Sequence, residues 1–134
     1  MTLVDSNVLI DILVADESWL EWSAMALDRC AADGLLLINE IVFAELAVRS
    51  ASEDALRADL DRISISIERT PLAALYVAGK VFAKYRASGG TRTSLIPNFF
   101  LGAHAQIAGL AILTRDARRY RTHFPSVRLI TPDP

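Results

Sequence analysis

Short β-branched or leucine-rich runs alternate with longer segments of helical periodicity along this chain. The short runs predict five strands, at 2–5, 35–38, 63–67, 111–114 and 127–130. Apolar residues at three- and four-residue spacing predict helices between them, at 6–13, 18–34, 39–50, 53–62, 71–89 and from Pro97 onward. Strand–helix alternation on this scale is typical of a parallel sheet covered on both faces, a three-layer α/β/α architecture.

Caps, prolines and glycines mark the ends of the expected helices. Ser6 or Asn7 is placed to cap the first helix, and Ser52 to cap the helix at 53–62. Residues 88–94 form a loop rich in glycine, serine and threonine. Pro97 suits a first helical turn, but Asn98 is a polar amide at the mouth of an otherwise apolar helix. Asn98 is therefore either a cap or a residue with a chemical role.

Length and composition indicate one globular domain over residues 1–134. The chain is large enough to bury a core without disulfides, and its 52% hydrophobic and 22% charged content is that of a folded protein. A single cysteine, Cys30, excludes an internal disulfide and a cysteine-cluster metal site. No apolar run approaches the ~20 residues of a membrane span, and no secretory signal opens the chain. We therefore expect a cytoplasmic protein without membrane association.

The net charge of −2 hides a strong division between the two parts of the chain. Residues 1–79 contain 5 Lys/Arg and 14 Asp/Glu, a net charge of −9, whereas residues 80–134 contain 9 Lys/Arg and 2 Asp/Glu, a net charge of +7. This division suits an acidic metal site beside a surface for a polyanion. Two ordinary solvated faces are the alternative.

Acidic residues follow two of the predicted strands. Ligands of parallel α/β sheets bind beyond the carboxyl ends of the strands, so these positions are candidates for chemistry. Asp5 ends the first strand and has no positive residue near it in the sequence. Asp116 follows the fourth strand, after Thr114 and Arg115. Helix capping is the alternative role for both aspartates.

Glu45 is the only charged residue of the segment 41–48. It shares a helical stripe with Ile41, Ala44 and Val48, which predicts that its carboxylate faces the interior. An unpaired charge there costs several kcal/mol, so Glu45 needs a metal, a proton or a cationic partner. Pairing with Arg49 or Arg115 is the structural alternative.

Four segments taken together resemble the PIN-domain family, and specifically the VapC-type toxins of bacterial type II toxin–antitoxin systems. The resemblance covers nearly the whole chain, and four motifs in order are specific. Its acidic positions correspond to Asp5, Glu45 and Asp116, while Asn98 stands where the family normally has aspartate. The four segments are LVDSNVLID at 3–11, INEIVFAELAVR at 38–49, LIPNFFLGAHA at 95–105 and LTRDARRYRTHFPSVRLI at 113–130.

The resemblance implies a ribonuclease dependent on Mg²⁺ or Mn²⁺ that cleaves cellular RNA. In that interpretation Asp5 and Asp116 are the main metal ligands, with Glu45 a ligand or an orienter of metal-bound water, and Asn98 completes the set of catalytic positions. Thr114 donates to a carboxylate or to the scissile phosphate. Candidate contacts to the RNA backbone are Arg92, Arg115, Arg118, Arg119 and Arg121.

Asn98 is where this chain departs from the family pattern. An amide keeps the shape of the side chain and still caps a helix, but it removes one negative charge. The change leaves the fold intact and impairs catalysis, so the alternative function is an inactive PIN-fold module that binds RNA or an antitoxin.

Partners and competing classes follow from the same residues. The resemblance implies a VapB-type antitoxin, an RNA substrate and a homodimer. A phosphoaspartate module of similar build needs a second acid close to Asp5 and a distant lysine; the segment 5–11 lacks the former, and no lysine follows Lys84. A zinc site is also disfavoured, since His104 has no cysteine near it and is best explained as helix packing.

Overall fold

The centre of the molecule is a five-stranded parallel sheet in the order β3-β2-β1-β4-β5. The computed structural model describes residues 1–93 and 96–132. All four strand pairings are parallel, which confirms the predicted fold class. The strands are β1 (Thr2–Val4), β2 (Leu36–Ile38), β3 (Ile65–Ile67), β4 (Ala111–Leu113) and β5 (Leu129–Ile130).

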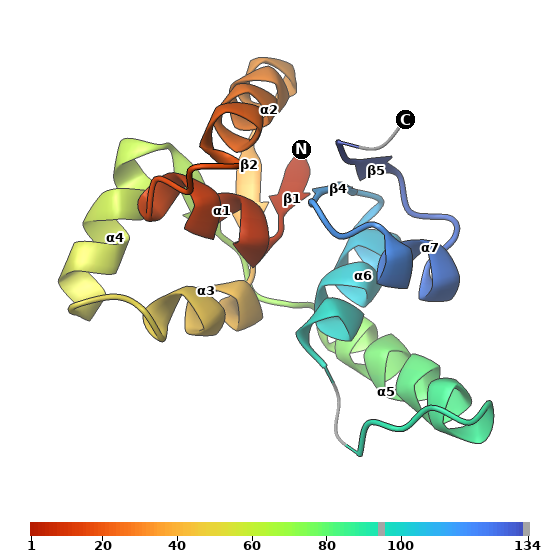
Figure 1. Cartoon of the computed structure of the whole chain (residues 1–134). Coiled ribbons are helices and arrows are strands. Elements are labelled where there is room, and N and C mark those ends of the chain that lie inside the picture. Colours follow the sequence, from red (N-terminus) through yellow and green to blue (C-terminus); the bar gives the residue numbers. More distant parts are fainter. Residues whose placement is uncertain (94–95, 133–134) are drawn as a thin grey trace.

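Helices cover both faces of this sheet. In Figure 1, α1, α2 and α4 lie on one side of the strands, and α5, α6 and α7 lie on the other. Helix α3 contacts α1 and α4 of the first group and α6 of the second. The helices are α1 (Ser6–Leu13), α2 (Leu20–Asp33), α3 (Glu40–Ala47), α4 (Glu53–Arg62), α5 (Leu72–Ala87), α6 (Pro97–Ala108) and α7 (Arg118–His123).

The register of the sheet decides which residues meet beyond its carboxyl edge. Val4 of β1 pairs with Leu113 of β4, so the residues that follow, Asp5 and Thr114, leave the sheet side by side. The Asp5 N–H donates to the Leu113 carbonyl at 2.9 Å and fixes this start of α1. The strand ends therefore place a buried carboxylate next to a buried hydroxyl.

The core lies on both faces of the central strands. All residues of β1, β2 and β4 are buried, as expected of a parallel sheet between two helical layers. Gly109 ends α6 in the left-handed conformation, at φ 68°, which favours glycine. A Cβ at Gly102 would lie 2.3 Å from the Phe124 ring, so that glycine lets α6 approach the segment after α7. No helix of the described residues has the length and hydropathy of a membrane span.

Several predicted helix ends differ from the structure. Asp5 itself caps α1, in place of Ser6 or Asn7. By contrast, the predicted cap Ser52 is confirmed at α4, and Asn39 caps α3 where that helix was expected to begin. Ile96 precedes α6, so Asn98 lies inside the first turn and is not its cap. Ala117 precedes α7, so the capping alternative for Asp116 is wrong. The loop expected at 88–94 and the motif at 95–105 each include a residue outside the described ones.

Candidate active site at the strand ends

Asp5 is a buried carboxylate surrounded by hydrogen-bond donors that carry no charge. It is 5% exposed. Its Oδ1 accepts the Ser6 N–H at 2.8 Å, and its Oδ2 accepts the hydroxyls of Thr114 and Tyr120, each at 2.8 Å. Burial raises the pKa of Asp5 against the lowering effect of these three bonds, and the charge of Asp116 raises it further. The carboxylate is thus ordered by neutral groups but not neutralised.

The Tyr120 hydroxyl connects Asp5 to Asn98. Tyr120 comes from α7 and is 1% exposed. The Asn98 amide nitrogen donates to the Tyr120 oxygen at 3.1 Å, and the Tyr120 hydroxyl donates to Asp5. A hydroxyl has a single proton. Because the Tyr120 oxygen accepts from the Asn98 amide, its own proton is donated to Asp5. Asn98 therefore belongs to the site through Tyr120, a residue that the sequence did not single out.

Two further carboxylates act electrostatically on this centre. The pKa of Glu45 is raised by partial burial and by the charge of Asp5, against a bond to the Ser6 side chain. Asp116 is exposed and raises the pKa of Asp5 through its charge. No ion pair of the described residues includes Asp5, Glu45 or Asp116. The site is a group of like charges without a cation.

The buried face of α3 is not the one that was predicted through Glu45. The buried residues of α3 are Val42 and Leu46, whereas Val48 of the predicted stripe is 83% exposed. The alternative, a pairing of Glu45 with Arg49 or Arg115, is absent among the described residues. Glu45 is half-buried beside the apolar face of α3, which explains its desolvation.

Thr114 organises the turn that carries Asp116. Its hydroxyl donates to Asp5 and accepts the Asp116 N–H at 3.0 Å and the Asn7 amide at 3.3 Å. The side-chain oxygen of Asn7, Oδ1, in turn accepts the backbone N–H of Arg115 at 3.2 Å. Of the two roles expected for Thr114, donation to a carboxylate is the one present here.

Arg115 is held by a bidentate ion pair with Asp11 of α1. Its Nε donates to Asp11 Oδ2 at 2.6 Å and a terminal nitrogen donates to Oδ1 at 3.0 Å, while the Ser23 hydroxyl donates to Oδ2 at 2.7 Å. The guanidinium also lies 4.7 Å from the centre of the Trp19 ring. These contacts give Arg115 a role in ordering the turn beside Asp116, and a contact from this residue to phosphate stays a prediction. Sequence analysis missed Asp11, although a lone acid among the apolar residues of α1 was a usable signal.

The residues fit a divalent cation that keeps most of its own water. Three of the roughly four acceptor positions of Asp5 are used by protein donors, which leaves one on Oδ1. In the described part of the chain, no three His, Cys, Asp or Glu side chains gather closely enough to hold a metal alone. Mg²⁺ is commonly held by one or two carboxylates with waters and substrate phosphates, and Asp5 with Asp116 or Glu45 suits that mode.

Comparison with models of known protein families shows which family the chain belongs to. The model of the PIN domain matches residues 2–125. The chain belongs to the PIN-domain family. No curated relative matched the sequence.

Solved structures with a similar fold include several toxin–antitoxin assemblies. One is VapBC2 from Rickettsia felis bound to a promoter DNA fragment, with a TM-score of 0.74 at 15% identity over 98% of each chain. A toxin–antitoxin complex from Klebsiella pneumoniae has a TM-score of 0.70 at 20% identity over 98% of each chain. FitAcB from Neisseria gonorrhoeae has a TM-score of 0.68 at 16% identity, also over 98% of each chain. At these identities the likeness shows a shared PIN fold.

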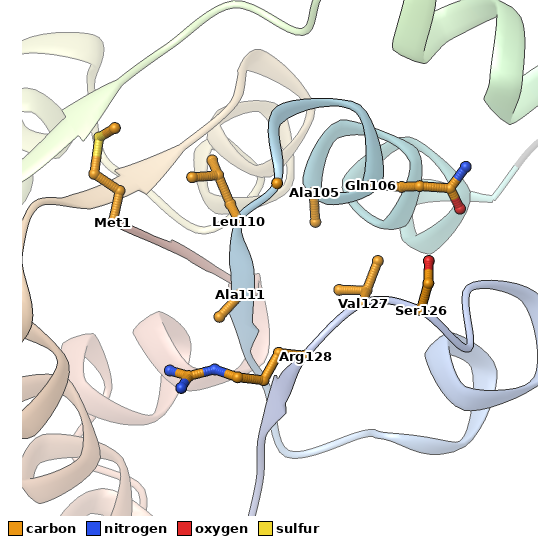
Figure 2. Close-up of a pocket in the computed structure, with 9 residues that line it drawn as sticks. Met1, Ala105, Gln106, Leu110, Ala111, Ser126, Val127 and Arg128 are labelled. Carbon is orange, nitrogen blue, oxygen red and sulfur yellow. The ribbon is translucent and has the colours of Figure 1, made fainter.

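Other predicted positions lie outside the carboxylate centre. Arg92 is exposed, and its backbone N–H donates to the Tyr85 hydroxyl at 3.1 Å. His104 is fully buried beside Asn39, which confirms packing as its role. A hollow of about 340 Å³ lies at the opposite end of the sheet, between Met1, Gln106 and Arg128 (Figure 2). Its lining contains no carboxylate, so it is separate from the candidate site.

Proposed function

We propose that this PIN domain is the VapC-type toxin of a type II toxin–antitoxin pair, and a Mg²⁺- or Mn²⁺-dependent endoribonuclease whose activity Asn98 impairs. The observation that carries the proposal is the group of Asp5, Glu45 and Asp116 near the strand ends, with which no cationic side chain of the described residues forms an ion pair. Family membership and the toxin–antitoxin assemblies among the similar structures support it.

Each residue of the centre has a role that follows from its contacts. Asp5 and Asp116 would hold the cation. Glu45 orients the attacking water or accepts a proton from it, because burial and the charge of Asp5 raise the pKa of Glu45. Thr114 and Tyr120 keep Asp5 in one orientation. A bound Mg²⁺ or Mn²⁺ supplies an activated water and stabilises charge on the phosphate.

Asn98 impairs this centre in two ways. It contributes a dipole where the family has a charge, which weakens attraction for a divalent cation. It also donates to Tyr120, so that the Tyr120 proton is directed at Asp5 Oδ2 and occupies that oxygen. An aspartate at position 98 would accept from Tyr120 instead, and would release part of the Asp5 carboxylate for the metal.

Restoring the acid tests the proposal. Cleavage of total RNA is measured at fixed Mg²⁺ or Mn²⁺ with the chain as it stands and with Asn98→Asp. The Asp form should cleave at least about tenfold faster, the equivalent of ~1.4 kcal/mol, and should be toxic to cells without an antitoxin. A double variant with Asp5→Asn is the control for contaminating nuclease and should abolish the gain. Equal activity of the two single forms would show that Asn98 does not impair the site.

The second candidate function is an inactive PIN-fold module that binds RNA or antitoxin. The hydrogen bonds from Asn98 to Tyr120 and from Tyr120 to Asp5 favour it, because they occupy an acceptor position of the buried carboxylate that a metal would otherwise use. Under this alternative, neither form cleaves RNA although the antitoxin binds both.

The partners proposed for the toxin are a VapB-type antitoxin and a second copy of the chain. The similar structures from Rickettsia felis and Klebsiella pneumoniae are of toxins with their antitoxins. Exposed apolar side chains such as Leu72, 82% exposed, and Tyr76, 67% exposed, offer area for such contacts. Co-purification with a small DNA-binding protein encoded directly upstream tests the antitoxin. Light scattering of the purified chain, which gives its molar mass in solution, tests the homodimer.

A further inference from the structure

A second hollow lies between the carboxyl ends of α5 and α7. Its volume is about 550 Å³, within the range of small-ligand pockets. Lys84 and Tyr85 of α5 line one part of it, His123 of α7 lines another, and Gly90 closes the loop after α5. A Cβ at Gly90 would lie 2.4 Å from the Tyr85 ring, so the glycine holds that loop against the ring. The Tyr85 and His123 rings meet edge to face, with centroids 5.7 Å apart.

This hollow begins one helical turn from the carboxylate centre. Tyr120, which donates to Asp5, and His123, which lines the hollow, are three residues apart in α7 and so share a face of that helix. Phe99, the neighbour of Asn98 in α6, contacts the His123 ring at a centroid distance of 4.9 Å. A polymer bound at Asp5 that follows α7 would reach the hollow with its next units.

The charges around the hollow are positive. Residues 80–93 and 96–132 contain a single acid, Asp116. The Arg92 N–H and the charge of Arg119 both lower the pKa of Tyr85, and burial together with Arg119 lowers the pKa of His123. Arg119 lies four residues before His123 in α7, so the two side chains share a face of that helix. None of the ion pairs within the described residues includes Lys84 or Arg119.

We propose that this hollow is a subsite for a nucleotide of single-stranded RNA flanking the cleavage position, with Lys84 and Arg119 on the phosphates and Tyr85 and His123 beside the base. The inference rests on the proposed function and adds the place where the substrate is held. Unpaired cations beside aromatic rings are the combination with which proteins bind single strands. An acidic peptide would need the cations but gain nothing specific from the two rings, which favours RNA.

RNA binding without cleavage tests this subsite. A labelled single-stranded RNA of mixed sequence is titrated in EDTA with the unmodified chain and followed by fluorescence anisotropy. Lys84→Ala and Arg119→Ala should each weaken binding about fivefold at ~0.1 M salt, and each should reduce the slope of log affinity against log salt by about 0.7. The matched control is Lys80→Ala, one turn earlier on α5 and 5.6 Å from the Tyr76 ring, which should change affinity less than twofold. Thermal melts of all variants check that the fold is retained.

The outcomes separate the subsite from the proposed function. Equal effects of Lys84→Ala, Arg119→Ala and Lys80→Ala would overturn the subsite while RNA binding itself persists. Competition distinguishes the ligand classes: RNA should displace the label better than polyphosphate of equal charge, because only RNA has bases for the rings. Stronger competition by poly-glutamate would assign the hollow to an acidic protein and overturn the RNA subsite. Absence of RNA binding by the unmodified chain would overturn the subsite together with its RNA substrate.

Discussion

Two buried aspartates at the ends of the short helix α1 have opposite surroundings. Asp11 is 1% exposed and receives two bonds from the Arg115 guanidinium and one from the Ser23 hydroxyl. Asp5 is 5% exposed and, among the described residues, receives hydrogen bonds from neutral donors only, while it interacts with the like charges of Glu45 and Asp116. One carboxylate is compensated within the protein, and the other is not.

The difference separates a structural role from a functional one. A buried charge without a partner is unfavourable, and under the proposed function a bound cation is the partner that Asp5 lacks among the described residues. At Asp11 the partner is internal, and the pair ties α1 to the turn after β4. Removing Asp11 should therefore cost stability, whereas removing the charge of Asp5 should cost function.

The largest expected effect on stability comes from breaking the compensated pair. Asp11→Ala leaves Arg115 unpaired, and because that side chain is 27% exposed we expect a loss of about 3 kcal/mol, near the lower bound for broken buried pairs. Urea unfolding measures it. Asp28→Ala, at an exposed position of α2, is the matched control and should change the free energy of unfolding by less than ~0.5 kcal/mol. If Asp11→Ala lowered the free energy of unfolding no more than Asp28→Ala does, Asp11 would have no structural role.

A smaller effect is expected from the hydroxyl that links Asn98 to Asp5. Tyr120→Phe removes one donor from Asp5 and one acceptor from Asn98, which should lower the free energy of unfolding by about 1 kcal/mol. Tyr76→Phe, at an exposed ring, is the control. The same variant frees an acceptor on Asp5 and should bind Mn²⁺ more tightly than the parent; weaker binding would mean that Tyr120 supports the metal and does not compete with it.

The smallest effect should appear as a pH dependence. The pKa of Asp5 in the folded chain is raised above its ordinary value of 3.8, so its contribution to stability is present at low pH and is lost as pH rises through the folded pKa. Asp5→Asn removes that loss, and its stability relative to the parent should increase with pH above about 4. Unfolding free energies from pH 3 to 7 test this. A difference independent of pH would mean that Asp5 is not destabilised by its charge.

The strands and the positions of Asp5 and Asp116 at strand ends could be predicted from the sequence, because they depend on local signals. Short β-branched or leucine-rich runs, one of them alternating with serine, identified the five strands. The parallel arrangement then placed Asp5 and Asp116 beyond strand ends. The family resemblance rested on the same short segments, and the match over residues 2–125 confirms it.

Contacts between distant elements were beyond that reasoning. The Asn98 amide donates to Tyr120 of α7. That helix has six residues, most of them basic, and no side-chain cap from which its start could be predicted. Arg115 finds Asp11 across 104 positions of sequence. The buried face of α3 contains Val42 and Leu46, so the predicted stripe through Glu45 was wrong at Ala44 and Val48, which are exposed. Packing of whole layers, and not periodicity within one helix, decides these pairings.

Mn²⁺ affinity tests most directly that the uncompensated centre at Asp5 is a metal site weakened by Asn98. Isothermal titration with Mn²⁺ is carried out on the chain, on Asn98→Asp and on the double variant that adds Asp5→Asn. The account predicts at least about tenfold tighter binding by Asn98→Asp, as one added carboxylate contributes ~1–3 kcal/mol in a partly screened site, and loss of that gain in the double variant. Equal Mn²⁺ affinity in all three proteins would contradict it.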